Sequence, residues 1–260
     1  MANMTCPITG TAAEHTLIVF DKDGVLLDLN ATWMPVITAM GAYLEEKCHH
    51  RTSKEELLAL VGVDLIPGHP SGGEIRENSL FAAGTFANMR DVWAEREPAL
   101  APLFADIERY RNDINAIVME TARGATVAKG AVKAGITALK NAGFKLGVAT
   151  NDNTASALIN LEDLAIQDQF DVIICADSGY GRKPEGGGLL HACTATGISP
   201  DAAIMVGDTA TDYLAAQAAG YKGFVTIADT APIKPDFIPH TDAVLASVAD
   251  LPNILLQNGA

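Results

Sequence analysis

The sequence predicts an α/β fold, with a Rossmann-like parallel sheet that is interrupted by one long helical insert. After residue 124, short apolar runs of strand length alternate with segments whose apolar residues recur at helical spacing. This alternation is typical of a parallel sheet with helices on both faces. A first strand is expected at residues 17–21, whereas the next begins only at residue 145. Because a structureless loop of that length is uncommon in a compact domain, we expect the stretch between them to fold as its own unit.

The two units are expected to divide the chain where these patterns change. Residues 1–29 and 124–260 form the expected core, and residues 30–123 form an inserted all-helical domain. Hinges are expected near residues 28–30 and 123–127, so that the insert would act as a lid over the core.

Helical spacing and capping residues define the elements of the insert. Asn30 is expected to cap the first helix, whose apolar residues recur from Trp33 to Leu44. Ser53 with Glu56 three residues later forms a capping box, which opens a second helix. Further helices are expected at residues 78–96 and 98–122, and no regular structure in the glycine- and proline-rich residues 63–73.

In the core, strands and helices are expected to alternate as far as the last strand. Strands are expected at residues 145–150, 172–176, 203–207, 223–227 and 243–245. Helices are expected at residues 131–141, 154–164, 188–196 and 209–219. The strands are short and apolar, as strands of a parallel sheet that is covered on both faces are.

The charge of the chain argues against two classes of partner. Its formal net charge is -14, whereas a nucleic acid or an anionic membrane requires a basic surface. Apolar residues make up 48% and charged residues 19% of the chain, which describes a globular protein. A small anionic substrate is compatible with this charge if its site holds a metal ion or a local lysine.

Cysteines and apolar runs predict a cytoplasmic protein. The four cysteines show neither metal-ligand spacing nor the density of a disulfide scaffold; they are Cys6, Cys48, Cys175 and Cys193. The N-terminal sequence lacks the basic segment and apolar stretch of a signal peptide. No apolar run in the sequence is long enough to span a bilayer. We therefore expect reduced cysteines and no membrane partner.

Two carboxylates follow the first expected strand directly. Asp21 and Asp23 lie two residues apart, and on an extended chain their side chains would point to opposite faces. Gly24 allows the chain to leave the extended conformation, so that both carboxylates can reach one substrate. Such a pair can divide its work between a nucleophile or metal ligand and a group that exchanges protons. For this segment alone, an ordinary strand followed by an Asp-Gly turn is the alternative.

Polar groups also follow the next three strands. They are Thr150 and Asn151 after the second strand, Lys183 after the third, and Asp208 and Asp212 after the fourth. Alone, Thr150, Asn151 or Asp208 could cap a helix. Lys183 alone could be a solvated surface lysine. Because ligands bind beyond the carboxyl ends of parallel strands, four such strand ends together indicate a site for phosphate or metal.

The chain resembles the haloacid dehalogenase superfamily in four motifs, which occur in the order of that family. The motifs are Asp21-Lys22-Asp23-Gly24, Thr150, Lys183, and Gly207-Asp208 with Asp212. The helical insert after the first motif resembles the cap domain of the phosphoglycolate phosphatase and β-phosphoglucomutase group. Asp23 argues against a true dehalogenase, which is expected to lack this second carboxylate. Val25, where many phosphatases of the group have threonine, also suits the mutase branch.

The resemblance implies a catalytic role for each of the first three motifs. Asp21 would attack phosphorus and form an aspartyl-phosphate. Asp23 would protonate the leaving oxygen and then activate the water that cleaves this intermediate. Thr150 and Lys183, with Asn151 beside them, would bind the phosphoryl oxygens.

The resemblance also implies a Mg²⁺ ion, which would offset the negative charges in the site. Its ligands would be Asp21, Asp208 and the backbone carbonyl of Asp23. Asp212 would either hold a metal-bound water or orient Lys183. In this way an acidic protein would bind an anionic substrate.

The implied activity is that of a Mg²⁺-dependent phosphatase, which acts on a small phosphorylated metabolite such as phosphoglycolate. A phosphosugar mutase of the β-phosphoglucomutase type, which reuses the aspartyl-phosphate, is the first alternative. A non-catalytic binding protein with the same fold is less favoured, because every catalytic group is present. The sequence does not indicate the oligomeric state.

Substrate specificity is expected to reside in the insert, because the sheet motifs would contact only the phosphoryl group and the metal. The candidate segment is residues 63–76, whose polar side chains include His69, Ser71 and Arg76. Arg76 would pair with a carboxylate of the substrate. A solvated loop with an exposed arginine is the alternative.

Overall fold

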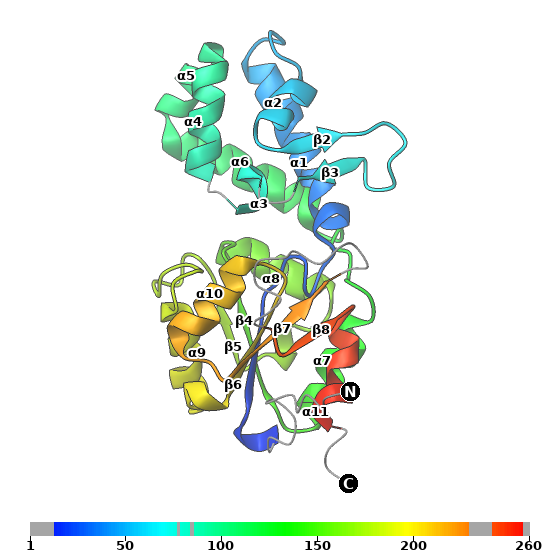
Figure 1. The fold of residues 1–260 in the computed structure, drawn as a ribbon. Helices are drawn as coiled ribbons and strands as arrows, with labels where there is room; N and C mark the ends of the chain where they lie inside the picture. Colours follow the sequence, from blue (N-terminus) through cyan, green and yellow to red (C-terminus); the bar gives the residue numbers. More distant parts are fainter. Residues whose placement is uncertain (1–12, 77–78, 84–85, 229–240, 257–260) are drawn as a thin grey trace. The chain divides into compact units, whose positions relative to one another are not determined.

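The computed structural model describes residues 13–76, 79–83, 86–228 and 241–256 of the chain (Figure 1). The chain divides into two compact units. The core unit comprises Met1–Asp28 and Ala128–Ala260, and the inserted unit comprises Leu29–Val127. Along the chain, the inserted unit thus separates the first strand of the core unit from all the others.

The core unit contains, among the described residues, a sheet of six parallel strands. They are β1 (Leu17–Phe20), β4 (Lys145–Ala149), β5 (Val172–Ile174), β6 (Ala203–Gly207), β7 (Gly223–Ile227) and β8 (Ala243–Leu245). Their order in the sheet is β5-β4-β1-β6-β7-β8, so β1 pairs with β4 on one side and with β6 on the other. This confirms the Rossmann-like α/β core that the sequence predicts.

The residues of β1 are fully buried, because both faces of the sheet are covered. Successive side chains of a strand point to opposite faces. Ile18 and Phe20 accordingly pack in one apolar cluster, and Leu17 and Val19 pack in another. A strand that is buried on both sides explains why this segment is apolar at every position.

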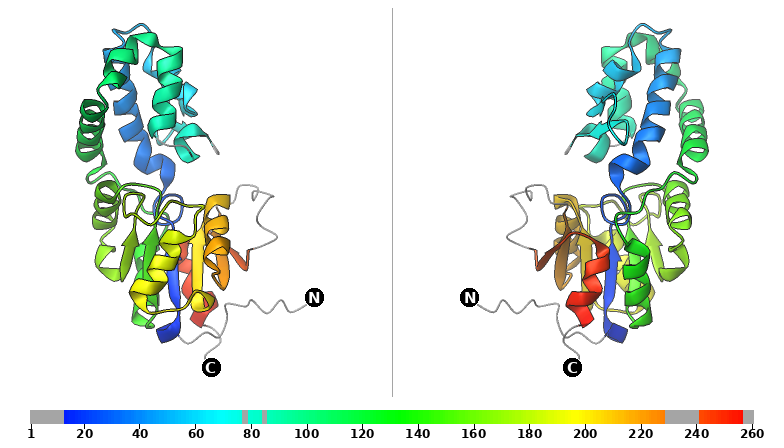
Figure 2. Two further views of the ribbon diagram at one scale, coloured as in Figure 1. Left: turned by 90° about the vertical axis from the view of Figure 1, so that its left-hand side faces the viewer. Right: turned by 90° about the vertical axis from the view of Figure 1, so that its right-hand side faces the viewer.

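Helices cover both faces of this sheet, which lies between two helical layers (Figure 2). Three helices contribute to the apolar cluster that contains Phe20: α7 (Val132–Asn141), α8 (Thr154–Asp163) and α11 (Leu251–Leu256). Two helices contribute to the cluster that contains Leu17: α9 (Gly187–Thr196) and α10 (Ala210–Ala219). The apolar faces of these helices therefore pack on the sheet and leave its carboxyl edge to polar residues.

The inserted unit is mainly helical. Its described helices are α1 (Leu29–Lys47), α2 (Lys54–Leu60), α3 (Leu80–Ala83), α4 (Phe86–Arg96), α5 (Ala101–Ala105) and α6 (Ile107–Ala122). Trp93 of α4 is fully buried and donates its indole N–H to the carbonyl of Leu57 at 2.8 Å, which joins α4 to α2. The predicted capping box of Ser53 and Glu56 is present at the start of α2.

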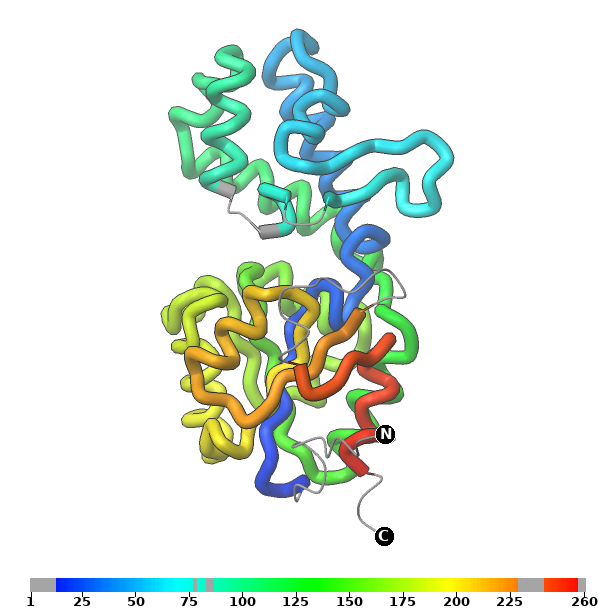
Figure 3. Tube along the Cα trace, in the orientation of Figure 1, coloured from blue at the N-terminus to red at the C-terminus, as the bar shows by residue number. Residues whose placement is uncertain are grey.

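An antiparallel hairpin also lies in the inserted unit, formed by β2 (Val63–Leu65) and β3 (Gly73–Ile75) (Figure 3). The expectation of an all-helical insert, without regular structure at residues 63–73, is therefore wrong at these strands. Gly73 permits the close pairing, because an added Cβ would lie 2.1 Å from the carbonyl oxygen of Asp64. The other glycines and prolines of this segment form the turn between the strands, so its composition is that of a hairpin loop.

Asn30 is not the helix N-cap that the sequence predicts. Helix α1 begins at Leu29, and the side-chain oxygen of Asn30 accepts a hydrogen bond from the backbone N–H of Ile75 at 2.9 Å. Asn30 thereby fixes β3 to α1. A capping residue and a residue that reaches a distant strand have the same polar side chain, so the sequence alone does not separate them.

The structure bears on both of the later helices predicted for the insert. The expected helix at residues 78–96 corresponds to α3 and α4, and residues 84–85 between them lie outside the described residues. The expected helix at residues 98–122 is interrupted at Asp106, whose backbone is not helical. The carboxylate of Asp106 caps α6 by accepting the N–H of Arg109 at 3.1 Å.

The described cysteines are free thiols, and the described helices include no candidate for a membrane span. Within the described ranges, no helix has both the length and the apolar character that a membrane span requires. Cys48, Cys175 and Cys193 are buried free thiols, as expected, and Cys6 lies outside the described residues. The cytoplasmic location stays a prediction.

Candidate active site

Asp21 lies at the carboxyl end of β1, at the edge of the sheet where ligands bind in this class of fold. Its backbone N–H donates to the carbonyl of Val206 at 2.9 Å, which continues the pairing with β6. Its side chain is buried, and Oδ1 accepts the N–H of Lys22 at 2.7 Å. Burial, and after it the Asp212 carboxylate, raises the pKa of Asp21 from 3.8 to about 7. A cation is needed to keep this carboxylate ionised.

Lys183 supplies such a cation. Its Nζ lies 2.7 Å from Oδ1 of Asp21 and 2.6 Å from Oδ1 of Asp212. Burial alone would lower the pKa of the ammonium, but the two carboxylates outweigh this effect and raise it. Lys183 is therefore charged at neutral pH and is not the solvated surface lysine of the alternative interpretation.

Asn151 fixes the backbone of Lys183. Its side-chain oxygen accepts the N–H of Lys183, and its side-chain NH₂ donates to the carbonyl of the same residue, each at 2.9 Å. Both ends of this amide are thus bound to one peptide segment. The predicted role of Asn151 in substrate binding stays a prediction, and in the structure its amide bonds to the backbone of Lys183.

Asp212 is fully buried on the first turn of α10. Its Oδ2 accepts the backbone N–H of Asp208 at 3.2 Å, and both the N–H and the hydroxyl of Thr209 at 3.0 and 2.7 Å. Its Oδ1 faces Lys183. The sequence left two roles open for Asp212, to hold a metal-bound water or to orient Lys183. The structure contains the contact with Lys183 that the second role requires.

Three carboxylates gather at this edge of the sheet. Oxygens of Asp21, Asp208 and Asp212 all lie within 4.8 Å of one another. Oδ1 of Asp208 is buried and, within the described structure, has no hydrogen-bond partner. Burial and the neighbouring Asp212 and Asp21 carboxylates raise the pKa of Asp208. Hard oxygen donors that repel one another, one of them without a partner, fit a divalent cation such as Mg²⁺.

Gly24 lets the first motif approach Asp208. Its φ of 76° lies in the left-handed region, and an added Cβ would lie 2.1 Å from Oδ2 of Asp208. The chain turns back at this point, since the N–H of Gly24 donates to the carbonyl of Leu27 at 3.0 Å. The sequence predicts a bend at Gly24, but the contact with Asp208 is visible only in the fold.

Asp23 lies in the loop that follows β1, and Thr150 directly follows the neighbouring strand β4. The Asp23 side chain is 26% exposed, and its carboxylate contacts the ammonium of Lys22 at 2.8 Å. Thr150 is buried, and its hydroxyl accepts the N–H of Asp152 at 3.1 Å. Thr150 and Lys183 also line one narrow cavity of about 10 Å³. The predicted residues of the core unit therefore lie on neighbouring strand ends.

Sequence reasoning assigned no role to Lys22, although this residue is fully buried and charged groups surround it. A lysine between two acids, directly after an apolar strand, is a signal that could have drawn attention to it. Burial of a lysine is uncommon without carboxylate partners.

Arg76 belongs to the inserted unit and is already paired there. Its Nε lies 3.2 Å from Oδ2 of Asp64, and its guanidinium donates to the carbonyl of Ala59. The hydroxyl of Ser71 lies 3.0 Å from Nδ1 of His69 in the hairpin loop. These three side chains stabilise the hairpin, and a role of Arg76 in substrate binding stays a prediction.

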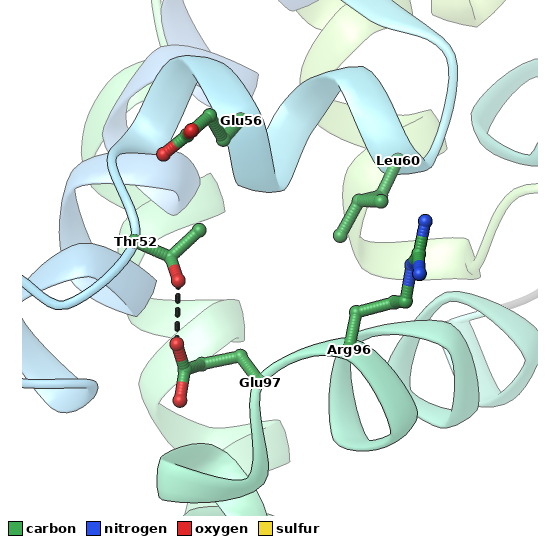
Figure 4. Close-up of a pocket in the computed structure, with 5 residues that line it drawn as sticks. All are labelled: Thr52, Glu56, Leu60, Arg96 and Glu97. Carbon is green, nitrogen blue, oxygen red and sulfur yellow. Dashed lines mark hydrogen bonds between the residues drawn. The ribbon is translucent and has the colours of Figure 1, made fainter.

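A cavity of about 220 Å³ lies in the inserted unit (Figure 4). It is lined by Thr52, Glu56, Leu60, Arg96 and Glu97. Glu97 accepts the hydroxyl of Thr52 and the N–H of Ala99, and Glu56 forms the capping box with Ser53. Because these acids already stabilise helix ends and loops, we place the candidate chemistry in the core unit.

The fold and the site define an α/β enzyme whose acidic centre contains two buried lysines, Lys22 and Lys183. A family model described as haloacid dehalogenase-like hydrolase matches residues 15–220, which include β1 and all four motifs. The chain belongs to the haloacid dehalogenase-like hydrolase family. The resemblance predicted from the four motifs is thereby confirmed.

Proteins named phosphoglycolate phosphatase are among its relatives. One from Nitrosococcus oceani is 33% identical over 261 residues, which are 94% of this chain and 98% of that protein. Another, from Caulobacter vibrioides, is 29% identical over 90% of this chain and 88% of that protein. The solved structure of a predicted phosphoglycolate phosphatase from Haemophilus somnus has a TM-score of 0.67 and 19% identity, over 94% of this chain and 99% of that chain. This last likeness concerns the fold alone.

Proposed function

We propose that this protein is a Mg²⁺-dependent phosphatase of small phosphate monoesters, with phosphoglycolate as the favoured substrate. The chain is a hydrolase of phosphoric monoesters by its family and by relatives that are named phosphatases. The observation that carries the proposal is the position of Lys183, whose ammonium bridges Asp21 and Asp212 at 2.7 and 2.6 Å. A fixed cation beside a strand-end carboxylate lets this acidic protein accept a phosphoryl group.

Asp21 is the proposed nucleophile. One of its carboxylate oxygens attacks phosphorus and forms an aspartyl-phosphate, while the bond from phosphorus to the leaving oxygen breaks. Asp23 gives a proton to the leaving oxygen in this step. It then takes a proton from the water that hydrolyses the aspartyl-phosphate. The products are an alcohol and inorganic phosphate, and both carboxylates return to their starting states.

Lys183 and Thr150 are the proposed ligands of the phosphoryl oxygens. Both side chains line the same narrow cavity and therefore lie near each other at the carboxyl edge of the sheet. Asn151 acts in this proposal through the backbone of Lys183, which it holds from both sides. A lysine that is fixed before substrate arrives needs little rearrangement on binding.

The proposed Mg²⁺ site consists of Asp21, Asp208 and the backbone carbonyl of Asp23, with Asp212 beside them. The oxygens of the three carboxylates lie close enough to share one ion. When bound, Mg²⁺ supplies positive charge that offsets the phosphoryl group and the carboxylates. The unpartnered oxygen of Asp208 supports its assignment as a ligand.

The phosphosugar mutase alternative uses the same residues. Val25, which also suits the mutase branch, is fully buried in the apolar cluster of the sheet. Its apolar side chain thus has an explanation in packing, and the relatives reported above are named phosphatases. We therefore favour hydrolysis, and steady release of inorganic phosphate without a bisphosphate activator distinguishes it from the mutase.

We propose further that the inserted unit, Leu29–Val127, serves as the cap that selects the substrate. Arg76 is the candidate for a substrate carboxylate, and it would then have to exchange its present partner Asp64. Hydrogen exchange at residues 63–76 tests this proposal. Protection of these amides by Mg²⁺ and a phosphate mimic supports the cap role, and unchanged exchange contradicts it.

A phosphatase screen tests the function itself. Phosphate release from a panel of metabolite monoesters, phosphoglycolate included, is measured with Mg²⁺ and with EDTA. We expect Mg²⁺-dependent release from wild type and none from Asp21→Asn. No Mg²⁺-dependent release from wild type, with the same result for Asp21→Asn, contradicts an enzymatic role and favours a binding protein.

A further inference from the structure

Lys22 contacts both acids of the first motif. Its backbone N–H donates to Oδ1 of Asp21 at 2.7 Å. Its ammonium lies 2.9 and 2.8 Å from the two carboxylate oxygens of Asp23. Lys22 thus contacts the carboxylate of the proposed nucleophile, Asp21, and the carboxylate of the proposed acid/base, Asp23.

The ammonium of Lys22 is fixed from two further directions. It donates to the side-chain oxygen of Asn160 on α8 at 2.8 Å, and it lies 3.4 Å from Oδ2 of Asp152 in the loop after β4. The side chains of Lys22 and Asn160 are fully buried. Three protons of one ammonium therefore meet oxygens from the first motif, the β4 loop and a helix.

The surroundings keep Lys22 charged. Burial alone would lower the pKa of its ammonium, but Asp23 and Asp152 outweigh this effect and raise it. A buried ammonium is stable only with such partners, so the contact with Asp23 is strongly favoured. The side chain of Asp23 is 26% exposed, and the buried ammonium of Lys22 is its fixed partner.

The backbone of the first motif is fixed at the same residue. The carbonyl of Lys22 accepts the N–H groups of Leu26 and Leu27, at 2.9 and 3.2 Å. The loop that contains Asp23 therefore closes on Lys22 through its backbone, and the side chain of Lys22 ties that loop to α8 and to the β4 loop.

We propose that Lys22 is a positioning residue, which holds the carboxylate of Asp23 at the leaving oxygen while Asp21 attacks. This inference rests on the proposed phosphatase function. A proton donor accelerates the reaction only when it lies within hydrogen-bond reach of the leaving oxygen. A partly exposed acid gains from a partner that restricts its rotamers.

The leaving group gives a readout that a purely structural role does not move. An alkoxide leaves only with a proton from Asp23, whereas 4-nitrophenolate leaves readily without one. Single-turnover release of the leaving group is measured for phosphoglycolate and for 4-nitrophenyl phosphate, which isolates the first step. In Lys22→Met we expect a loss of about 100-fold or more with phosphoglycolate, and a loss of less than about 10-fold with the aryl ester.

A double-mutant cycle with Asp23→Asn makes the test specific. If Lys22 acts through Asp23, adding Lys22→Met to Asp23→Asn lowers the phosphoglycolate rate no further. Lys145→Met, which removes a partly exposed ammonium paired with Asp171, is the control and leaves both rates unchanged. If Lys22→Met is unstable, the double variant with Asp152→Asn removes a buried cation and a buried carboxylate together and takes its place.

Three results overturn the inference. They are equal losses with the two esters, an additive loss in the cycle, and a rate increase in Lys22→Met, which would show that Lys22 holds Asp23 away from the reacting atoms. If wild type itself releases no phosphate, the proposed function fails, and the role of Lys22 fails with it. Wild-type activity combined with any of the three results defeats the role of Lys22 alone.

Discussion

The ammonium of Lys183 and the carboxylate of Asp212 form a buried pair, with 2.6 Å between Nζ and Oδ1. The other carboxylate oxygen of Asp212 accepts three hydrogen bonds at the start of α10, which fix this side chain. A fixed carboxylate in turn fixes the lysine, whose Nζ then lies 2.7 Å from Asp21. Helix α10 thus determines where the cation meets the proposed nucleophile.

Replacing Asp212 tests this arrangement. Asp212→Asn keeps the size of the side chain but removes the charge that orients Lys183, so we expect kcat to fall about 10- to 100-fold, as for other groups that orient a catalytic residue. Phosphate release at saturating Mg²⁺ is the measurement. Asp171→Asn is the control, because Asp171 also binds two lysines, Lys140 and Lys145, but lies at the start of β5. Equal kcat values for the two variants would contradict the arrangement.

Gly24 and Gly124 have nearly the same φ angle but different surroundings, so replacing each by alanine distinguishes backbone strain from a steric clash. Gly24 and Gly124 have φ values of 76° and 75°, but an added Cβ meets Asp208 only at Gly24 and meets nothing within 4 Å at Gly124. Gly124→Ala should lower the free energy of unfolding by about 1–2 kcal/mol and leave activity intact. Gly24→Ala should lower it further and raise the Mg²⁺ concentration needed for half-maximal activity. Similar Mg²⁺ requirements in the two variants would contradict the close contact with Asp208.

The carboxylates of the site would make the proposed binding of Mg²⁺ depend on pH. Burial and Asp212 raise the pKa of Asp21 to about 7, so the folded state binds this proton more tightly than the unfolded state does. The resulting stabilisation is complete below the ordinary value of 3.8 and is lost as pH rises through about 7. Mg²⁺ requires the ionised carboxylates and competes with these protons below that pH.

Thermal unfolding measures this competition. We expect the increase of Tm on addition of Mg²⁺ to be larger at about pH 8 than at about pH 5.5. In Asp21→Asn, which has no proton to lose at this position, the difference between the two pH values should shrink. An increase of Tm that is equal at both pH values would contradict a metal site that includes Asp21.

The two asparagines of the β4 loop should have different effects. Asn151→Ala removes both hydrogen bonds to the backbone of Lys183, and we expect kcat to fall about 10-fold or more. Asn153→Ala removes the cap of α8, a bond to the N–H of Ser156, and should lower the free energy of unfolding by about 1 kcal/mol without loss of kcat. Steady-state kinetics and denaturant unfolding of both variants provide the comparison, and full activity of Asn151→Ala would oppose the proposed support of Lys183.

The parallel sheet was predictable because its strands are continuous apolar runs between helical segments. Burial on both faces forces this composition, as β1 illustrates. The polar strand ends were predictable for the same reason, since a polar residue directly after such a run must lie at the edge of the sheet. Their functional roles came from the order of the four motifs and not from any residue alone.

The contacts that the sequence did not reveal join residues far apart in the chain. Lys22 and Asn160 are separated by 138 positions, and no local pattern links them. Asn30 looks like a helix cap but bonds to Ile75, 45 positions away. The hairpin of β2 and β3 was missed because its strands have three residues each, too few to show an alternating pattern.

Trapping the proposed aspartyl-phosphate tests the central claim most directly. Wild-type protein is mixed with Mg²⁺ and a ³²P-labelled phosphate monoester that it hydrolyses, then quenched in acid and digested. We expect label on the peptide that contains Asp21, release of this label by hydroxylamine, and no label in Asp21→Asn. Label on another residue, or hydrolysis that continues in Asp21→Asn, would contradict the assignment of Asp21 as the nucleophile.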